Sequence, residues 1–308
     1  MIWGDVLQNN PDAIHKINAK VTCLNWYYGY GAKEQFAKLC HDNNLNQYVC
    51  PSVSGYSRLV NDYDLSFTNI SEMVEIGIKY QADGFLNTDW GDCGHINMPA
   101  LNIPCLIYGA AKSWNNNDCR DFATIDKTIS FLEYDDHSRM LVGSLRELSH
   151  QDLITINDLV FFRDYKTYNQ VYKLNGVIMH RKVKGKVMHT SEKQLKSAVA
   201  NCFKILKRLK QNESTRHLEL HQLMNEYYLA ARGVALMQEF ALILKQKEYA
   251  QTNIRPLDTP FELASKLEDW LMDYCKDWRT VSRESELYRI REFIWQICAI
   301  LRKNYGVH

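Results

Sequence analysis

The chain has 308 residues, of which 46% are hydrophobic and 24% charged, as in an ordinary folded protein with room for two domains. A formal net charge of +1 argues against nucleic acid or a membrane surface as a partner. No apolar run approaches the roughly 20 residues of a membrane span, and we expect no signal peptide because the sequence opens in a strand-like run. Nine cysteines without CxxC pairs favour reduced thiols, so the expected location is cytoplasmic.

The first third of the chain alternates between short strand-like runs and longer helix-like segments. Runs rich in β-branched and aromatic residues predict four strands, at residues 1–7, 21–28, 47–54 and 84–90. Apolar residues at helical spacing predict helices between and after them, most clearly at residues 66–81 and 101–114. Four strand–helix units in succession favour parallel strands with right-handed crossovers. We therefore expect an α/β domain over residues 1–117.

From about residue 118 onward, strand signals become rare and helical patterns dominate. Amphipathic patterns predict helices at residues 192–210, 214–247, 259–278 and 283–304. We expect Gly233 to interrupt the second of these helices. Thr259 as N-cap and Pro260 at the first helical position mark the start of the third. Residues 118–308 are therefore predicted to form an α-helical region.

Three tryptophans, Trp3, Trp26 and Trp90, lie at or near the carboxyl ends of predicted strands. In a barrel of parallel strands, this end carries the active site. Carboxylates and amides accompany them in the sequence, namely Asp5, Asn25, Asn87, Asp89 and Asp92. Aromatic faces stack on the C–H faces of sugar rings, and carboxylates accept hydrogen bonds from vicinal hydroxyls, so the pattern favours a neutral carbohydrate. The alternative is that the tryptophans are core residues whose N–H groups neighbouring carboxylates satisfy.

Several motifs together resemble a known enzyme family. The segments "MIWGDVL", "VTCLNWYY", "YVCPS" and "GFLNTDWGDCGH" followed by "LIYGAAKSW" resemble the last four strand–helix units of family 20 glycoside hydrolases, the β-N-acetylhexosaminidases. The segment "WRTVSRESELYRIREFIW" resembles the helical extension of the bacterial branch that carries "TDWGD". The resemblance covers essentially the whole chain. It implies a partial TIM barrel, the C-terminal half of a (β/α)8 barrel over residues 1–117, with a C-terminal α-helical domain over residues 118–308.

The resemblance also implies a set of substrate-binding residues. Trp90 matches the family tryptophan that forms a wall of the sugar pocket, and Asp92 stands, as a shorter acid, where the family has a glutamate for the far hydroxyls. Trp3 and Trp26 are similar to the pocket tryptophans of the fifth and sixth strands. Tyr56 is the candidate for the tyrosine that holds the N-acetyl carbonyl. The resemblance implies no cofactor and no metal.

The catalytic residues of the family have no counterpart in the sequence. In family 20, an aspartate orients the acetamido group, whose oxygen attacks the anomeric carbon, and the adjacent glutamate protonates the leaving oxygen. No Asp-Glu dipeptide occurs in the chain, and the tandem Asp135-Asp136 is predicted to lie in a solvated turn. We therefore assign no catalytic residue and expect the isolated chain to be inactive.

Two functions remain open. The chain is expected to be a portion of a β-N-acetylhexosaminidase-like hydrolase, which removes terminal N-acetylhexosamine when an N-terminal half supplies the Asp-Glu pair. Alternatively, it is a non-catalytic carbohydrate-binding remnant or pseudoenzyme. Because four strands cannot close an eight-stranded barrel, we expect the chain to self-associate, to bind a complementary half, or to cover its edges with the helical part. The partner molecule in either case is a glycan with N-acetylhexosamine.

Overall fold

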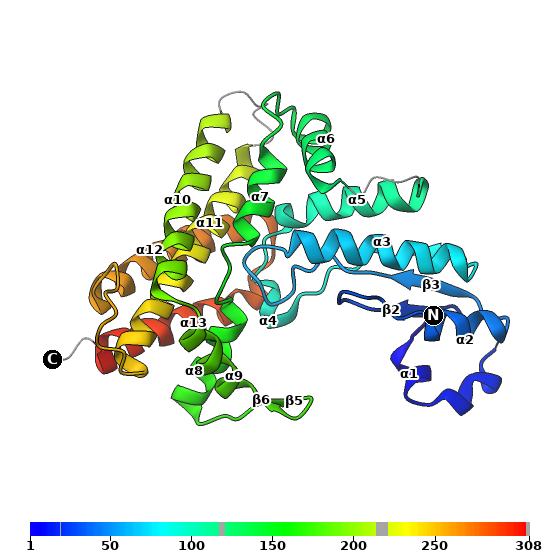
Figure 1. Cartoon of the computed structure of the whole chain (residues 1–308), viewed down its shortest axis with the longest axis horizontal. Helices are drawn as coiled ribbons and strands as arrows, with labels where there is room; N and C mark the ends of the chain where they lie inside the picture. Colours follow the sequence, from blue (N-terminus) through cyan, green and yellow to red (C-terminus); the bar gives the residue numbers. More distant parts are fainter. Residues whose placement is uncertain (19, 117–120, 214–220, 306–308) are drawn as a thin grey trace. The chain divides into compact units, whose positions relative to one another are not determined.

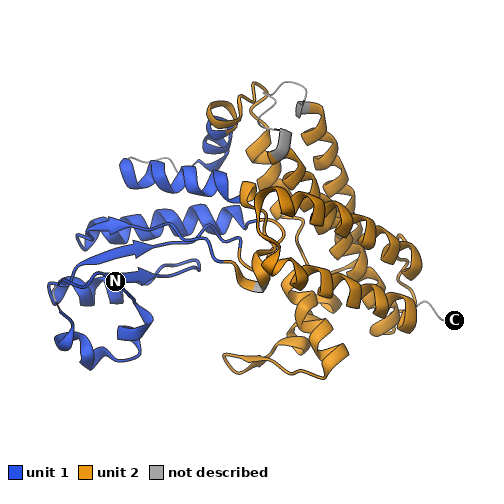
Figure 2. Ribbon diagram, turned by 180° about the vertical axis from the view of Figure 1, so that it is seen from behind, with its two compact units in different colours: residues 1–55, 61–90, 102–129 blue, residues 56–60, 91–101, 130–308 orange. Residues whose placement is uncertain are grey.

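The structure, a computed structural model, describes residues 1–18, 20–116, 121–213 and 221–305. It is mostly helical and contains a small parallel sheet of four strands, so the α/β class is confirmed (Figure 1). The chain divides into two compact units, coloured separately in Figure 2, and each is described by itself. Unit 1 comprises Met1–Gly55, Asn61–Trp90 and Asn102–Ile129, and unit 2 comprises Tyr56–Val60, Gly91–Leu101 and Ser130–His308.

The sheet of unit 1 has the order β1-β2-β3-β4, with every neighbouring pair parallel. The strands are shorter than the sequence predicts: β1 is Ile2–Trp3, β2 is Cys23–Trp26, β3 is Gln47–Cys50 and β4 is Gly84–Phe85. The chain leaves β1 at Gly4, whose N–H still donates to the Leu24 carbonyl, and turns at once into a helix. The prediction of four parallel strands is confirmed, but their predicted ends are not.

The helices of unit 1 gather on one face of this sheet. They are α1 (Asp5–Gln8), α2 (Gln35–Asp42), α3 (Tyr63–Lys79), α5 (Ile103–Trp114) and the first part of α6 (Phe122–Tyr134), with a 3-10 helix at Pro11–Lys16. Cys23 packs among Leu7, Phe36 and Cys40, and Val49 packs among Ala37, Met73 and Ile76. Because side chains alternate along a strand, the opposite face carries Leu24 and Trp26, together with Trp3 and Tyr48, which are both register partners of Leu24.

Unit 2 is helical apart from a two-stranded hairpin, β5 (Lys173–Leu174) with β6 (Val177–Ile178). Its helices are the end of α6, α4 (Asp92–His95), α7 (Leu141–Ser149), α8 (Ile156–Tyr168), α9 (Met179–His189), α10 (Glu192–Glu213), α11 (His221–Ile243), α12 (Pro260–Val281) and α13 (Leu287–Ile300). Helix α11 contacts both α10 and α12. A capping box between Thr259 and Glu262 starts α12, which confirms the predicted N-cap. Within the described ranges, no helix is both long enough and apolar enough to cross a membrane.

Gly233 does not interrupt its helix, contrary to the prediction. Helix α11 runs continuously from His221 to Ile243, and the part of the predicted segment before residue 221 lies outside the described residues. A Cβ atom at Gly233 would lie 2.9 Å from Leu59 Cδ1 and 2.9 Å from Trp270 Cζ2. The glycine therefore permits close packing on the Trp270 indole rather than a break in the helix.

The tandem Asp135-Asp136 forms a turn, but the prediction of a solvated turn is wrong for Asp136. Its side chain is fully buried, and its two carboxylate oxygens accept hydrogen bonds from the backbone N–H groups of Ser138, Met140 and Leu141. These donors lie just before α7 and at its first residue, where no earlier helical turn supplies acceptors. The carboxylate is thus part of the start of α7.

Candidate functional site

The three predicted tryptophans of unit 1 lie at one edge of its sheet. Trp3 is the last residue of β1 and Trp26 the last residue of β2. Beyond β4, Thr88 forms a parallel bridge with Ser52, and Trp90 follows two residues later. Because all four strands are parallel, these positions share the carboxyl edge of the sheet, where the ligand sites of parallel sheets usually lie.

Tyr28 joins these tryptophans into a connected group, which we call the aromatic cluster (Trp3, Trp26, Tyr28 and Trp90). The ring centroids of Trp3 and Trp90 are 5.2 Å apart, and those of Trp26 and Tyr28 are 4.9 Å apart. The Trp90 indole N–H donates to the Tyr28 hydroxyl oxygen over 2.7 Å, with 6.4 Å between the ring centroids. Residues from three separate stretches of the sequence are therefore in direct contact.

The aromatic cluster is partly open to solvent. Trp90 is 37% exposed, and the other three members are half-buried. The Trp26 indole N–H donates to the Asp5 carboxylate over 3.2 Å. This contact is expected under the alternative hypothesis, in which the tryptophans are core residues paired with neighbouring carboxylates. The exposure of Trp90 distinguishes the cluster from a closed core, since aromatic surface remains available to a ligand.

A chain of hydrogen bonds holds the segment before Trp90 in place. The Thr88 hydroxyl and the Thr88 N–H both donate to the Pro51 carbonyl. The Asn102 amide donates to the Asp89 carboxylate over 2.8 Å and accepts from the Asn61 amide over 2.7 Å. The contact with Asn102 holds the exposed residue Asp89, which directly precedes Trp90 in the sequence. The segment is therefore anchored to β3 and to α5 rather than hanging free.

A cavity of about 570 Å³ adjoins the cluster at Trp26. Its lining includes Asn25, Trp26, Tyr27, Lys33 and Phe36. Asn25 is buried, and its amide nitrogen has no hydrogen-bond partner within the part of the chain that the structure describes. Buried polar groups are usually paired, so this amide is available to a ligand or an ordered water molecule. The volume suits a ligand of sugar size.

The remaining two predicted binding residues belong to unit 2. Asp92 is exposed and begins the four-residue helix α4. Tyr56 is half-buried, in a segment that unit 2 holds through an ion pair between Arg58 and Asp152, 3.7 Å apart. The contacts that unite Trp3, Trp26 and Trp90 are all internal to unit 1.

Sequence reasoning missed three residues of the site. Tyr28 stood outside the predicted binding set, although its position two residues after Trp26 was a usable signal. Asn61 and Asn102 carried no signal, since they lie 41 residues apart and meet only in the folded unit.

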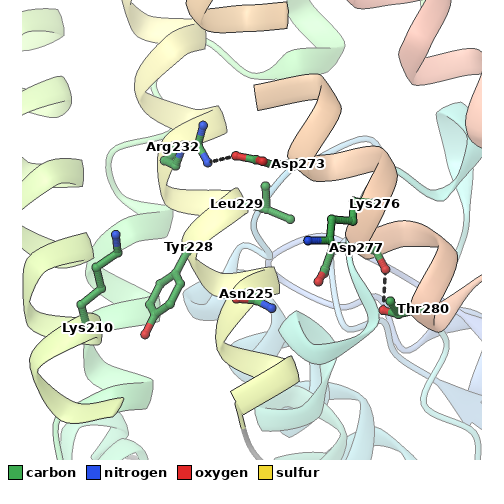
Figure 3. Close-up of a pocket in the computed structure, with 9 residues that line it drawn as sticks. All are labelled: Lys210, Asn225, Tyr228, Leu229, Arg232, Asp273, Lys276, Asp277 and Thr280. Atoms are coloured by element: carbon green, nitrogen blue, oxygen red, sulfur yellow. Dashed lines mark hydrogen bonds and ion pairs between the residues drawn. The ribbon is translucent and has the colours of Figure 1, made fainter. Parts of the chain in front are cut away.

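Unit 2 has a cavity of its own, of about 370 Å³, lined by residues of α10, α11 and α12 (Figure 3). Arg232 and Asp273 form an ion pair of 2.5 Å there, and the Lys210 ammonium lies 5.6 Å from the centre of the Tyr228 ring. Asp277 is buried, and burial raises its pKa. Arg232 and Asp273 are engaged with each other, and the cavity lies outside the carboxyl edge of the parallel sheet, so we consider it a weaker candidate than the aromatic cluster.

No family model matches the chain, and no curated protein matches it. Among the described residues, no group of three or more histidine, cysteine, aspartate or glutamate side chains is arranged to hold a metal ion. The aromatic cluster and its surroundings are therefore the part of the molecule from which a function is inferred.

Proposed function

We propose that the aromatic cluster binds a terminal N-acetylhexosamine, and that the chain is a portion of a β-N-acetylhexosaminidase-like glycoside hydrolase. The observation that supports this most is the contact between Trp3, Trp90, Tyr28 and Trp26 at the carboxyl edge of a parallel sheet. Half-exposed aromatic faces beside the carboxylate of Asp5 offer both stacking and a hydrogen-bond acceptor, and Asp89 precedes Trp90 in the sequence. This combination suits a neutral sugar better than a charged ligand.

The finer fold that goes with this proposal is half of a (β/α)8 barrel. Four consecutive parallel strands with their helices on one face support it, as does the position of Trp3, Leu24 and Trp26 on the other face. In a barrel the helices lie outside and that second face lines the interior. A complementary half would then pair with β1 and β4, the two end strands in the order of the sheet.

The proposed reaction is substrate-assisted hydrolysis with retention. The acetamido oxygen of the substrate forms a bond to the anomeric carbon while the glycosidic C–O bond breaks, and a glutamate gives its proton to the leaving oxygen. The same glutamate then takes a proton from the water that opens the intermediate. In the complete enzyme, a segment with an Asp-Glu pair would supply these groups. Tyr56 and Asp92 are proposed to contact the N-acetyl group and the far hydroxyls.

A second candidate function is carbohydrate binding without catalysis. The absence of an Asp-Glu dipeptide from the sequence favours it, as does the burial of Asp136, whose carboxylate is engaged by the start of α7. Both candidates require the same sugar site. They differ in whether hydrolysis appears when a segment with the acid pair is added.

Calorimetric titration with N-acetylglucosamine tests the sugar site. We expect Trp90→Ala to weaken binding at least about tenfold, since truncating a central aromatic contact typically costs 2 kcal/mol or more. Trp114→Ala is the matched control, because Trp114 is 92% exposed and outside the aromatic cluster, and it should bind like the unaltered chain. Equal affinity in both variants would refute the site.

Turnover separates the two candidate functions. We expect the chain alone not to hydrolyse 4-nitrophenyl N-acetyl-β-glucosaminide, because general acid–base assistance alone is worth roughly 10²–10⁴-fold in rate. Turnover by a mass-verified preparation, abolished by a mutation within the chain, would contradict this expectation.

A further inference from the structure

Helix α5 carries a lysine at a position where its pattern calls for an apolar residue. Cys105, Tyr108, Gly109 and Lys112 are all buried, at the spacing i, i+3, i+4 and i+7 that marks one face of a helix. The Tyr108 ring stacks on Phe67, with 4.2 Å between centroids, so this face packs into the interior of unit 1. Lys112 continues the same face one turn further and is only 4% exposed.

The Lys112 ammonium has no protein partner in the described part of the chain: neither a hydrogen bond nor an ion pair engages it. The nitrogen is not among the fully buried polar atoms without a partner, so it keeps contact with solvent although the residue is only 4% exposed. Lys38 of α2, in contrast, forms an ion pair with Asp42 at 2.5 Å. Because Lys112 lines a cavity and is otherwise covered, the accessible part of its ammonium can meet a ligand or ordered solvent there.

Lys112 lines a cavity of about 670 Å³ within unit 1. The apolar part of its lining comes from Val49, Val74, Ile78 and Phe85. The cavity reaches Gly84, the first residue of β4, and therefore lies toward the amino end of that strand, whereas the aromatic cluster lies at the carboxyl edge. It is thus a separate site from the proposed sugar site.

Two further polar groups narrow the choice of ligand. The side-chain oxygen of Asn116 is buried in the lining without a partner among the described residues, so it can accept from a ligand N–H or O–H group. Asp83 also lines the cavity, and one of its carboxylate oxygens accepts from the Gln47 N–H over 2.9 Å. A second negative charge would meet the Asp83 carboxylate, which disfavours a dianion such as phosphate.

We infer that this cavity binds an organic monoanion, a carboxylate with a small apolar body. The carboxylate meets the Lys112 ammonium, and the apolar body lies against Val49, Ile78 and Phe85. Charge-assisted hydrogen bonds of this kind are stronger than those between neutral groups. A neutral molecule of the same shape leaves the ammonium unpaired and binds more weakly.

Ligand-observed NMR with hexanoate and its neutral amide, hexanamide, tests the inference. We expect saturation transfer to hexanoate with the unaltered chain, and binding at least about tenfold weaker for hexanamide. Lys112→Met should weaken hexanoate binding by a similar factor. Lys38→Met, which removes one positive charge from an exposed ion pair of α2, should leave hexanoate binding unchanged.

A loss of hexanoate binding must be distinguished from a loss of folding in the Lys112 variants. Met retains the length and apolar stem of the lysine, so Lys112→Met should melt no lower than the unaltered chain, and hexanoate should raise the melting temperature only where Lys112 is present. If Lys112→Met does not fold, Lys112→Gln provides the neutral variant. Equal binding of hexanoate and hexanamide, hexanoate binding that survives loss of the charge, or no binding to the unaltered chain would each overturn the inference. If inorganic phosphate raised the melting temperature as much as hexanoate does, the inference that the ligand is a monoanion with an apolar body would be overturned.

Discussion

At the scale of single residues, burial separates carboxylates that look alike in the sequence. Asp135 and Asp136 are neighbours, yet Asp135 lies near the surface with its carboxylate 3.3 Å from the His137 imidazole, whereas Asp136 is fully buried. The Asp136 carboxylate accepts from the N–H groups that open α7. Its role is therefore structural, and no titrating or catalytic task is needed to explain it.

Replacing Asp136 by alanine should destabilise the fold strongly. Asp136 is not the N-cap residue, but it accepts from the N–H groups at the helix start, and losing such a side-chain acceptor costs about 0.5–2 kcal/mol. Leaving buried donors unsatisfied costs about 1–3 kcal/mol more. We expect a drop of about 2–4 kcal/mol in the free energy of unfolding, measured by urea denaturation. Asp135→Asn is the control, because Asp135 has a left-handed backbone (φ 49°) that asparagine tolerates, and it should change the free energy of unfolding by less than about 1 kcal/mol. Similar losses from both variants would contradict the assigned roles.

At the scale of elements, two glycines inside helices have opposite surroundings. Gly233 of α11 faces the Trp270 indole, whose N–H donates to the Leu229 carbonyl and so fixes the ring. Gly185 of α9 has no atom within 4 Å of where a Cβ would stand, apart from its chain neighbours and the backbone of its own helix. The same substitution should therefore have opposite effects at the two positions.

We expect Gly233→Ala to lower the free energy of unfolding by about 1–3 kcal/mol, because the added methyl group overpacks against Trp270. We expect Gly185→Ala to raise it by up to about 1 kcal/mol, because alanine favours the helix. Thermal or urea denaturation of both variants measures the difference. Stabilisation by Gly233→Ala would contradict the expected clash with Trp270 and would show that the helix preference of alanine outweighs it.

At the scale of the whole molecule, buried glutamates of unit 2 make stability depend on pH. Burial raises the pKa of Glu226 to about 7, and the nearby negative charge of Asp277 adds to the effect. Burial likewise raises the pKa of Glu239 to about 8. An unfolded glutamate has a pKa of about 4.3. Between these values the folded chain binds more protons than the unfolded chain, so the free energy of unfolding falls as pH rises from about 4.5 to about 8.

Glu226→Gln should flatten part of this dependence. The glutamine cannot lose a proton, and its amide oxygen can still accept from the Ala100 N–H, which now donates to Glu226 over 2.7 Å. One pKa unit corresponds to about 1.4 kcal/mol, so the fall between pH 5 and 8 should shrink by at most about 3 kcal/mol. Urea denaturation at several pH values measures it. A slope identical to that of the unaltered chain would contradict the raised pKa.

What the sequence could predict depended on local pattern. The alternation of strands and helices was enough for four parallel strands, and parallel strands bring Trp3 and Trp26 to one edge. The end of β1 at Gly4 was not predictable, because it depends on close packing against Leu24, which is far away in the sequence. A Cβ at Gly4 would lie 2.9 Å from the Leu24 carbonyl oxygen. The contact of Trp90 with Tyr28 was hidden for the same reason. Lys112 did leave a signal, a lysine in an apolar helical stripe.

Sugar binding by the aromatic cluster can be followed residue by residue through the indole N–H signals of the seven tryptophans. The chain is labelled with ¹⁵N at the tryptophan indoles, each signal is assigned by single replacement, and N-acetylglucosamine is titrated in. We predict shifts at Trp90, Trp26 and Trp3, with none at Trp114 or at the unit 2 tryptophans Trp270, Trp278 and Trp295. Shifts confined to those last four tryptophans, or no shift at millimolar sugar, would show that the aromatic cluster does not bind the sugar.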